Sequence, residues 1–390
     1  MEPLEAEMNA VPSRRRRARP AAAIALAAMA CLGSATTLDA QNTTAADRPA
    51  DAFAQAADAL YRVASARLSA RTGADLEASF GLFREAAQLD PTHARAHAGA
   101  ATAASLLALY SIVPPRSAFA AARSSAAEAL RLEPELAQAH AAMGLVSYLD
   151  AWDFPGAETH LRQALRLDAG LANAWHWYGM LLYATRRFEE SLAAYDRALA
   201  LEPGSSLFRA KRAAVLAAAG RAAGAERELR SAIERFPESA LPRRELGYLL
   251  VGDGRGEEGV AMLRSAAELS GALATNADLA WGFARTGRRS EAEAILASIE
   301  RESRRVAPWL DLALVSAGLE WRDEAFGWLG EALGARDPGL VYLATAPGWE
   351  PLRDDSRFAA LLGRVGLRAG GADVAADRRP APESTGGGAP

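Results

Sequence analysis

The stretch that decides the fold runs from Ala172 to Pro203 and is ANAWHWYGMLLYATRRFEESLAAYDRALALEP. Its large apolar residues recur at helical spacing in two groups, the first around Trp175 and the second around Tyr195. A proline ends the stretch, as expected where one helix stops and the next begins at a fixed angle. The stretch therefore predicts two antiparallel helices that end at Pro203.

Small residues in the same stretch mark where helices pass close to one another. Gly179 in the first helix and Ser191 in the second are predicted to lie at the crossing of the pair. Ala198 is predicted to contact the first helix of the next pair. Because one pair of helices cannot bury its apolar face alone, it must stack on similar neighbours.

Copies of this unit follow one another through most of the chain. Pro203, Pro237 and Gly271 are each separated by 34 residues. This period and this set of residues resemble the tetratricopeptide repeat. The resemblance implies an all-α fold, a right-handed α-solenoid of antiparallel helix pairs. The unit that ends at Pro134 is longer, and prolines at residues 114–115 predict a looped insertion between its helices.

The repeats do not account for the whole chain. We predict about eight units over residues 51–338 and a cap over residues 339–369. A solenoid must cover its last apolar face, and a short capping helix around Leu361 would do so. Residues 370–390 are rich in Gly, Pro and Ala and predict a disordered tail.

The amino-terminal 50 residues have the composition of an export signal. A basic block precedes the apolar run of residues 21–32, and Ala40 is a suitable cleavage position. We therefore expect a signal peptide at residues 1–40, a linker at residues 41–50 and a periplasmic location. Two alternatives remain open: residues 21–32 could anchor the chain in the inner membrane, or Cys31, the only cysteine, could be lipidated.

The composition argues against nucleic-acid and membrane partners. The chain has 390 residues, is 50% hydrophobic and 24% charged, and has a formal net charge of −4. This charge, without interleaved basic and aromatic residues, predicts no nucleic-acid partner. Contact with a membrane is expected only through the amino-terminal segment if that segment is retained.

A narrower resemblance links this chain to bacterial regulators. FREAAQLDP at residues 83–91, ALRLEP at residues 129–134 and PLRDDSRF at residues 351–358 are similar to the repeat region of regulators that carry a winged-helix, kinase or adenylate cyclase domain. The similarity spans roughly residues 55–367, and no effector domain accompanies it. It implies a solenoid that binds a partner, and neither transcription nor phosphorylation.

No residue constellation predicts catalysis. His93 and His97 would share one helix face, but no third metal ligand follows at close spacing. The glycine-rich residues 252–256 fall at a turn between helices, where glycine favours a helix end rather than phosphate binding. We therefore predict no enzyme activity, no cofactor and no metal.

The resemblance places the first helix of each pair on the concave side of the solenoid. Residues that point away from the packing positions would then line a groove for a protein or peptide partner. The predicted groove residues are Tyr148, Asn173, His176, Tyr183, Arg244, Tyr248, Trp281 and Arg285.

The sequence thus predicts a non-catalytic, exported scaffold that holds a protein or peptide partner in its concave groove. The alternative is a sensory or regulatory subunit that acts on a separate effector.

Overall fold

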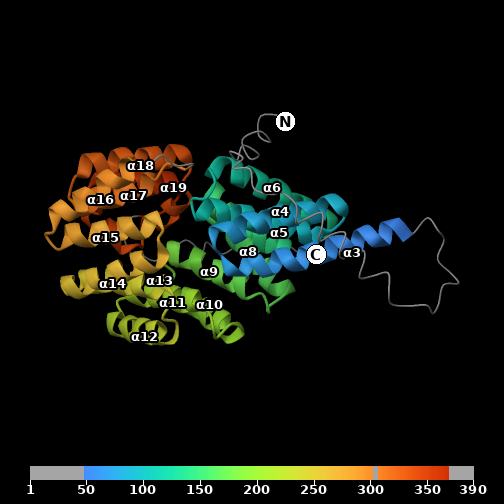
Figure 1. Cartoon of the computed structure of the whole chain (residues 1–390), viewed down its shortest axis with the longest axis horizontal. Coiled ribbons are helices and arrows are strands. Elements are labelled where there is room, and N and C mark those ends of the chain that lie inside the picture. Colours follow the sequence, from blue (N-terminus) through green and yellow to red (C-terminus); the bar gives the residue numbers. More distant parts are fainter. Residues whose placement is uncertain (1–47, 302–305, 369–390) are drawn as a thin grey trace, which may run out of the picture.

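The computed structural model describes residues 48–301 and 306–368, and within them all regular structure is helical. The helices form eight antiparallel pairs (Figure 1). The pairs are α3 (Arg48–Ala70) with α4 (Gly73–Leu89), α5 (Ala94–Leu109) with α6 (Pro115–Leu132), α7 (Ala137–Val146) with α8 (Phe154–Leu167), α9 (Ala172–Ala184) with α10 (Phe188–Leu201), α11 (Ser206–Ala218) with α12 (Ala222–Arg235), α13 (Ala240–Gly252) with α14 (Gly256–Ser270), α15 (Leu273–Arg285) with α16 (Arg289–Arg301), and α17 (Trp309–Gly318) with α18 (Arg322–Ala335).

Shorter elements complete the chain. A π-helix, η2 (Ser147–Ala151), extends α7, and two 3₁₀ helices, η3 (Pro338–Tyr342) and η4 (Pro347–Leu352), precede the last helix α19 (Ser356–Val365). The predicted all-α solenoid is confirmed. The π-helix was not predicted, because a single extra residue in a helical turn leaves the apolar spacing on either side nearly unchanged.

The ends of the chain differ from the prediction in one described detail. Residues 48–50, assigned to a linker, already belong to α3, whose first turn carries Asp51, a favourable charge at a helix amino terminus. The predicted signal peptide, the rest of the linker and the predicted tail lie outside the described residues. Among the described helices, none combines the length and apolarity needed to cross a bilayer.

Small residues mark the close crossing of the two helices in the first and fourth pairs. Ser191 Oγ on α10 donates to the carbonyl of Gly179 on α9 at 2.8 Å, and Ser79 Oγ on α4 donates to Ala64 on α3 at 2.9 Å. The buried ring of Tyr195 lies so close to Gly179 that a Cβ built there would be 2.8 Å from Cε2. The small residues predicted at the crossing are therefore required by the approach of the two helices.

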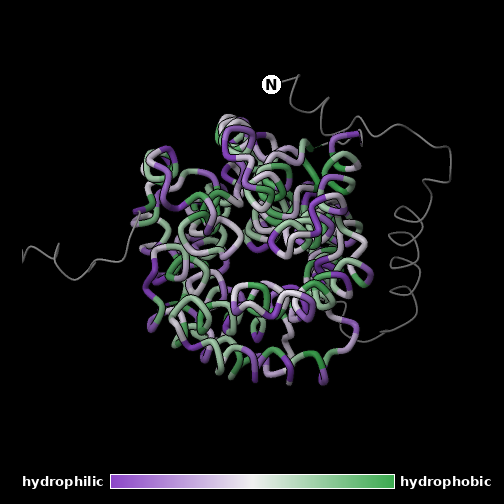
Figure 2. Tube along the Cα trace, turned by 90° about the vertical axis from the view of Figure 1, so that its left-hand side faces the viewer, coloured by the Kyte–Doolittle hydropathy of each residue, from purple (hydrophilic) through white to green (hydrophobic). Residues whose placement is uncertain are grey.

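Successive pairs stack through buried side chains. His176 of α9 is 3% exposed and packs between the rings of Tyr195 and Phe208, with centroids 5.7 and 5.1 Å away. Figure 2 shows hydrophilic and hydrophobic residues alternating along each helix of the array. The array curves so that α18, at its end, lies beside α6 of the second pair (Figure 1), where Arg116 donates to Gly334 O at 2.8 Å.

Replacement of Gly179 tests the close crossing. Gly179→Ala should lower the free energy of unfolding by about 1–3 kcal/mol, because the new methyl group overlaps the Tyr195 ring. The measurement is urea unfolding followed by circular dichroism. Gly330→Ala is the matched control: it is exposed in α18 with no atom near its Cβ position, and it should raise stability by roughly 0.5–1 kcal/mol. Equal effects at both positions would contradict the crossing.

Titration of His176 tests the packing between pairs. Burial lowers the pKa of His176 well below its ordinary value, and the charges of Arg71 and Lys211 lower it further. The unfolded chain takes up a proton below about pH 6.5, so this residue's contribution is fully present above that pH and is lost as the pH falls. Between about pH 7.5 and 5.5 the wild type should lose up to about 1.4 kcal/mol more than His176→Leu. The free energy of unfolding of both proteins is measured with urea at each pH. The same dependence on pH in both proteins would show that the folded chain does not hold His176 neutral.

Candidate functional site

The first helices of the middle and later pairs form the concave side of the array, and part of that side is covered by the chain itself. We call residues 338–352, which contain η3 and η4, the return segment. In η3 the ring of Tyr342 lies between two predicted groove residues, 6.4 Å from Tyr148 and 6.3 Å from Tyr183. The return segment therefore occupies the place that the sequence assigned to a partner.

The backbone of the return segment is held by side chains of the fourth pair. Tyr183 Oη donates to Thr345 O and Arg186 Nη1 donates to Ala344 O, both at 3.2 Å. Burial raises the pKa of Tyr183 above its ordinary value, which keeps its hydroxyl a donor. Two consecutive carbonyls of the return segment are thus satisfied by the concave side.

The second half of the return segment lies against later pairs. Trp349 and Leu352 of η4 are 6% and 0% exposed. Gly348 lies so close to α17 that a Cβ built there would be 2.4 Å from Cδ1 of Leu314. The residues predicted only as an end cap therefore also fill the inside of the curve.

Arg336, at the end of α18, joins the last pair to the third. Its guanidinium lies 4.4 Å from the ring centroid of Trp152, and Nε donates to Asp150 O at 3.1 Å. The Asp150 carboxylate, buried in the π-helix, pairs with Arg123. The π-helix therefore presents a carbonyl to the end of the array, and Trp152, the residue after the π-helix, presents an aromatic ring.

A group of polar residues remains on the concave side beyond the return segment. Lys211 Nζ lies 2.9 Å from Glu245 Oε1, and Arg244 Nη1 lies 3.7 Å from the same atom. The side chains of Lys211 and Arg244 keep 30% and 31% of their exposure. Burial alone would raise the pKa of Glu245, but Lys211 and Arg244 together hold it below its usual value.

Two further residues extend this group toward the first pair. Arg71, in the turn after α3, donates through Nη2 to Asn173 Oδ1 at 2.6 Å. Arg71 and Lys211 both lie near enough to His176 to lower its pKa. We call Arg71, Asn173, Lys211, Arg244 and Glu245 the inner polar patch.

Arg244 is also part of a buried cluster beneath this patch. It forms a two-pronged ion pair with Asp278, whose side chain is only 2% exposed. Tyr248 Oη donates to the same carboxylate at 2.5 Å, and its ring lies 4.6 Å from Trp281. Loss of Arg244 would leave a buried carboxylate without its cation, so this residue supports the fold as well as the surface.

The eight predicted groove residues thus fall into three environments. Four of them lie against the return segment: Tyr148, Tyr183, Tyr248 and Arg285. Arg285 approaches Glu350 of that segment at 3.5 Å. Asn173 and Arg244 belong to the inner polar patch. His176 and Trp281 are buried between helices at 3% exposure and do not reach the surface.

Sequence reasoning missed Arg71, Lys211, Glu245 and Asp278. A signal for three of them was present, because Lys211 and Glu245 are 34 residues apart, as are Arg244 and Asp278. This separation equals the repeat period, so opposite charges at one position of successive units lie side by side. Arg71 had no such signal, since its contact with Asn173 spans 102 residues.

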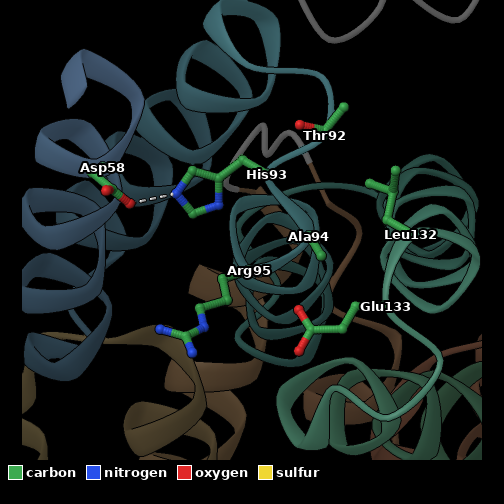
Figure 3. Close-up of a pocket in the computed structure, with 7 residues that line it drawn as sticks. All are labelled: Asp58, Thr92, His93, Ala94, Arg95, Leu132 and Glu133. Atoms are coloured by element: carbon green, nitrogen blue, oxygen red, sulfur yellow. Dashed lines mark hydrogen bonds and ion pairs between the residues drawn. The ribbon is translucent and has the colours of Figure 1, made fainter. Parts of the chain in front are cut away.

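The histidines on the outside of the array are occupied by structural hydrogen bonds. In the hollow of about 390 Å³ shown in Figure 3, His93 Nε2 bonds to Asp58 at 3.0 Å, while Nδ1 accepts from the Ala96 backbone at 3.1 Å. With both ring nitrogens bound, His93 has no free nitrogen to act as a base or a metal ligand.

Other side chains repeat a single structural contact. At the same place in four successive units, a side-chain N–H donates to the carbonyl six residues earlier: His97 to Pro91, His140 to Pro134, Trp175 to Ala169 and Arg209 to Pro203. These bonds fix the start of each unit on the end of the previous one. Among the described residues, no three His, Cys, Asp or Glu side chains gather as a metal site.

Comparisons with known proteins agree with this architecture. Residues 172–205 match the family model described as tetratricopeptide repeat. The TPR repeat-containing thioredoxin TTL4 of Arabidopsis thaliana is 38% identical over 77 residues, which is 19% of this chain. The chain spans only 11% of the length of that curated relative.

Solved structures of low sequence identity show a similar arrangement of helices. Yeast Tom70 is 15% identical with a TM-score of 0.49, over 85% of this chain and 69% of that one. The APC/C hetero-tetramer Cut9-Hcn1 is 15% identical with a TM-score of 0.49, over 83% and 57%. Pseudomonas aeruginosa pilF is 21% identical with a TM-score of 0.40, over 53% and 92%.

The matched unit is the fourth helix pair, and seven more pairs of the same architecture surround it in the described residues. Residues 172–205 therefore form a tetratricopeptide repeat, and the other described pairs repeat the helix-pair architecture of that unit.

Proposed function

We propose that this protein is a non-catalytic scaffold that binds a protein or peptide partner on the inner polar patch. The observation that carries the proposal is the contrast within the concave side. One part is filled by the return segment, while Lys211 and Arg244 keep about a third of their side-chain surface exposed. Exposed cations beside a buried apolar surface are typical of the rim where partner proteins bind.

The partner binds beside the return segment and does not displace it. Leu340, Val341 and Leu343 are fully buried, and Trp349 is 6% exposed. Exposing these four side chains would cost roughly 6–12 kcal/mol at about 1.5–3 kcal/mol each. A partner that binds with micromolar affinity provides only about 8 kcal/mol in total. Displacing the return segment would therefore use most or all of that free energy, so the segment is a permanent wall of the site.

The charges of the inner polar patch favour a partner with a carboxylate. Arg71 donates through Nη2 to the neutral side-chain amide of Asn173 at 2.6 Å. Glu245 and the Asp278 carboxylate beneath the patch balance Lys211 and Arg244, so the positive charge of Arg71 is in excess. A guanidinium in this setting can bind an acidic side chain or a peptide carboxyl terminus through two parallel hydrogen bonds.

Export belongs to the same proposal and is supported by residues 1–40, whose composition is that of a signal peptide. The scaffold would then act in the periplasm of a bacterium. A regulatory subunit acting on a separate effector would use the same surface, and only the identity of the partner distinguishes the two roles.

A single-site cross-linking experiment tests the proposed surface. Lys211 is the only lysine in the sequence, so an amine-reactive cross-linker attaches there and at the chain's amino terminus. A partner that binds the inner polar patch should be captured through Lys211, as identified by mass spectrometry of the cross-linked peptide. Its binding should fall about tenfold or more in Arg71→Ala/Lys211→Gln, since a charge-assisted contact contributes about 1.5 kcal/mol or more.

The control removes the same charge from the convex side. Arg197 and Arg227 are exposed on the second helices α10 and α12, so Arg197→Ala/Arg227→Ala also removes two cations. That variant should keep the partner. Arg244 is left intact in both proteins, because its loss would strand the buried Asp278 carboxylate. Equal binding by both variants would place the partner elsewhere and refute the patch.

A further inference from the structure

The first helix of the array is longer than its counterparts. The matched serine bonds make Ala64 of α3 equivalent to Gly179 of α9. α9 begins seven residues before Gly179, whereas α3 begins sixteen residues before Ala64. In Figure 1 this amino-terminal part of α3 projects past the other helices. A few helical turns without packing are only marginally stable in water, so the projection requires a contact that the chain described here does not supply.

In the fourth pair, the preceding pair covers one face of the first helix, and α3 has the same face without a described helix before it. Val63 is equivalent to Tyr178, which is 9% exposed and bonds to Glu158 of α8, in the pair before it. No described helix precedes α3, and Val63 is 49% exposed. Phe53, in the projecting part, is 53% exposed.

These two residues belong to one apolar stripe along α3. The stripe follows helical spacing, and all of its members are at least partly exposed: Ala52, Phe53, Ala56, Ala59, Val63 and Ala66. The other end of the array differs, because Arg357 of α19 pairs with Asp323 of α18 at 2.7 Å and the buried face of α19 is apolar. Solenoids need both ends covered, and only the carboxyl end is covered within the described residues.

We propose that the stripe on α3 binds the stripe of a second copy of this chain, with the two helices antiparallel. If the two-fold axis of the dimer passes between Ala59 and Leu60, Phe53 faces Ala66 of the second copy and Ala56 faces its Val63. Large side chains thus meet small ones, which permits close packing.

Charge along the edge of the stripe favours the same arrangement. In this register Asp58 lies near Arg62 of the second copy, twice by symmetry. A parallel pairing would instead place Asp58 near Asp58 and Arg62 near Arg62. Asp58 keeps 63% of its side-chain exposure while bonded to His93, so its carboxylate can accept a second donor.

The test is the molar mass of the full chain in solution, measured by light scattering over a concentration series. The wild type should be a dimer, and Phe53→Asp/Val63→Asp should be a monomer. The control is Tyr110→Asp/Leu201→Asp, which changes two other exposed apolar residues of 43% and 44% exposure and should remain a dimer. Helical circular dichroism must be the same for all three proteins.

A charge exchange tests the antiparallel register. Arg62→Asp should weaken the dimer roughly tenfold, because two favourable pairs become repulsive. Asp58→Arg added to that variant exchanges the two charges and should restore the affinity. Failure of the exchange to restore it would overturn the register.

Two other outcomes would overturn the proposal. A wild-type chain that is monomeric at all concentrations, both complete and starting at Gln41, would show that a second copy does not cover α3. A complete chain that is monomeric while the chain from Gln41 dimerises would assign the stripe to the protein's own amino-terminal residues. The inner polar patch is tested separately by partner capture, and its member closest to α3, Arg71, lies in the turn beyond the end of that helix.

Discussion

The close crossing of two helices within each pair is the constraint on which the rest of the structure depends. Gly179 leaves room for the Tyr195 ring, and the Ser191 hydroxyl satisfies the carbonyl that the crossing would otherwise bury unpaired. Ser79 and Ala64 repeat the same arrangement in the first pair. Once this distance is fixed, side chains such as His176 and Phe208 meet between pairs, and the small rotation between pairs accumulates into a curve.

The curve brings together parts of the chain that are far apart in sequence, and buried apolar residues hold them there. The largest core cluster includes Leu106 and Leu145 of the early pairs, Val315 of the eighth pair and Leu343 of the return segment. The middle helices α9–α13 also contribute to two smaller clusters. The return segment thus connects the two ends of the array, while the middle pairs leave the inner polar patch on the concave side.

Charge on the concave side follows the repeat. Lys211 with Glu245 and Arg244 with Asp278 are each one period apart, so stacking the units places opposite charges next to each other. The Arg244–Asp278 pair differs from an ordinary surface ion pair, because Asp278 is almost fully buried and accepts a third hydrogen bond from Tyr248. The concave side therefore combines a rigid base of buried pairs with exposed cations, which suits a surface that must bind without rearranging.

The sequence by itself determined the repeating unit and therefore the fold class. Gly179, Ser191 and Pro203 act on their nearest neighbours along the chain, and the 34-residue period carries the same contacts through the array. It also indicated the concave side, because the first helices could be identified from the repeat. The tertiary structure alone decided what occupies that side. Tyr342 reaches Tyr148 and Tyr183, and Arg71 reaches Asn173, across more than a hundred residues in each case. Such contacts depend on the accumulated curvature of eight pairs, a quantity that small differences in every interface set together and that no local pattern of residues encodes.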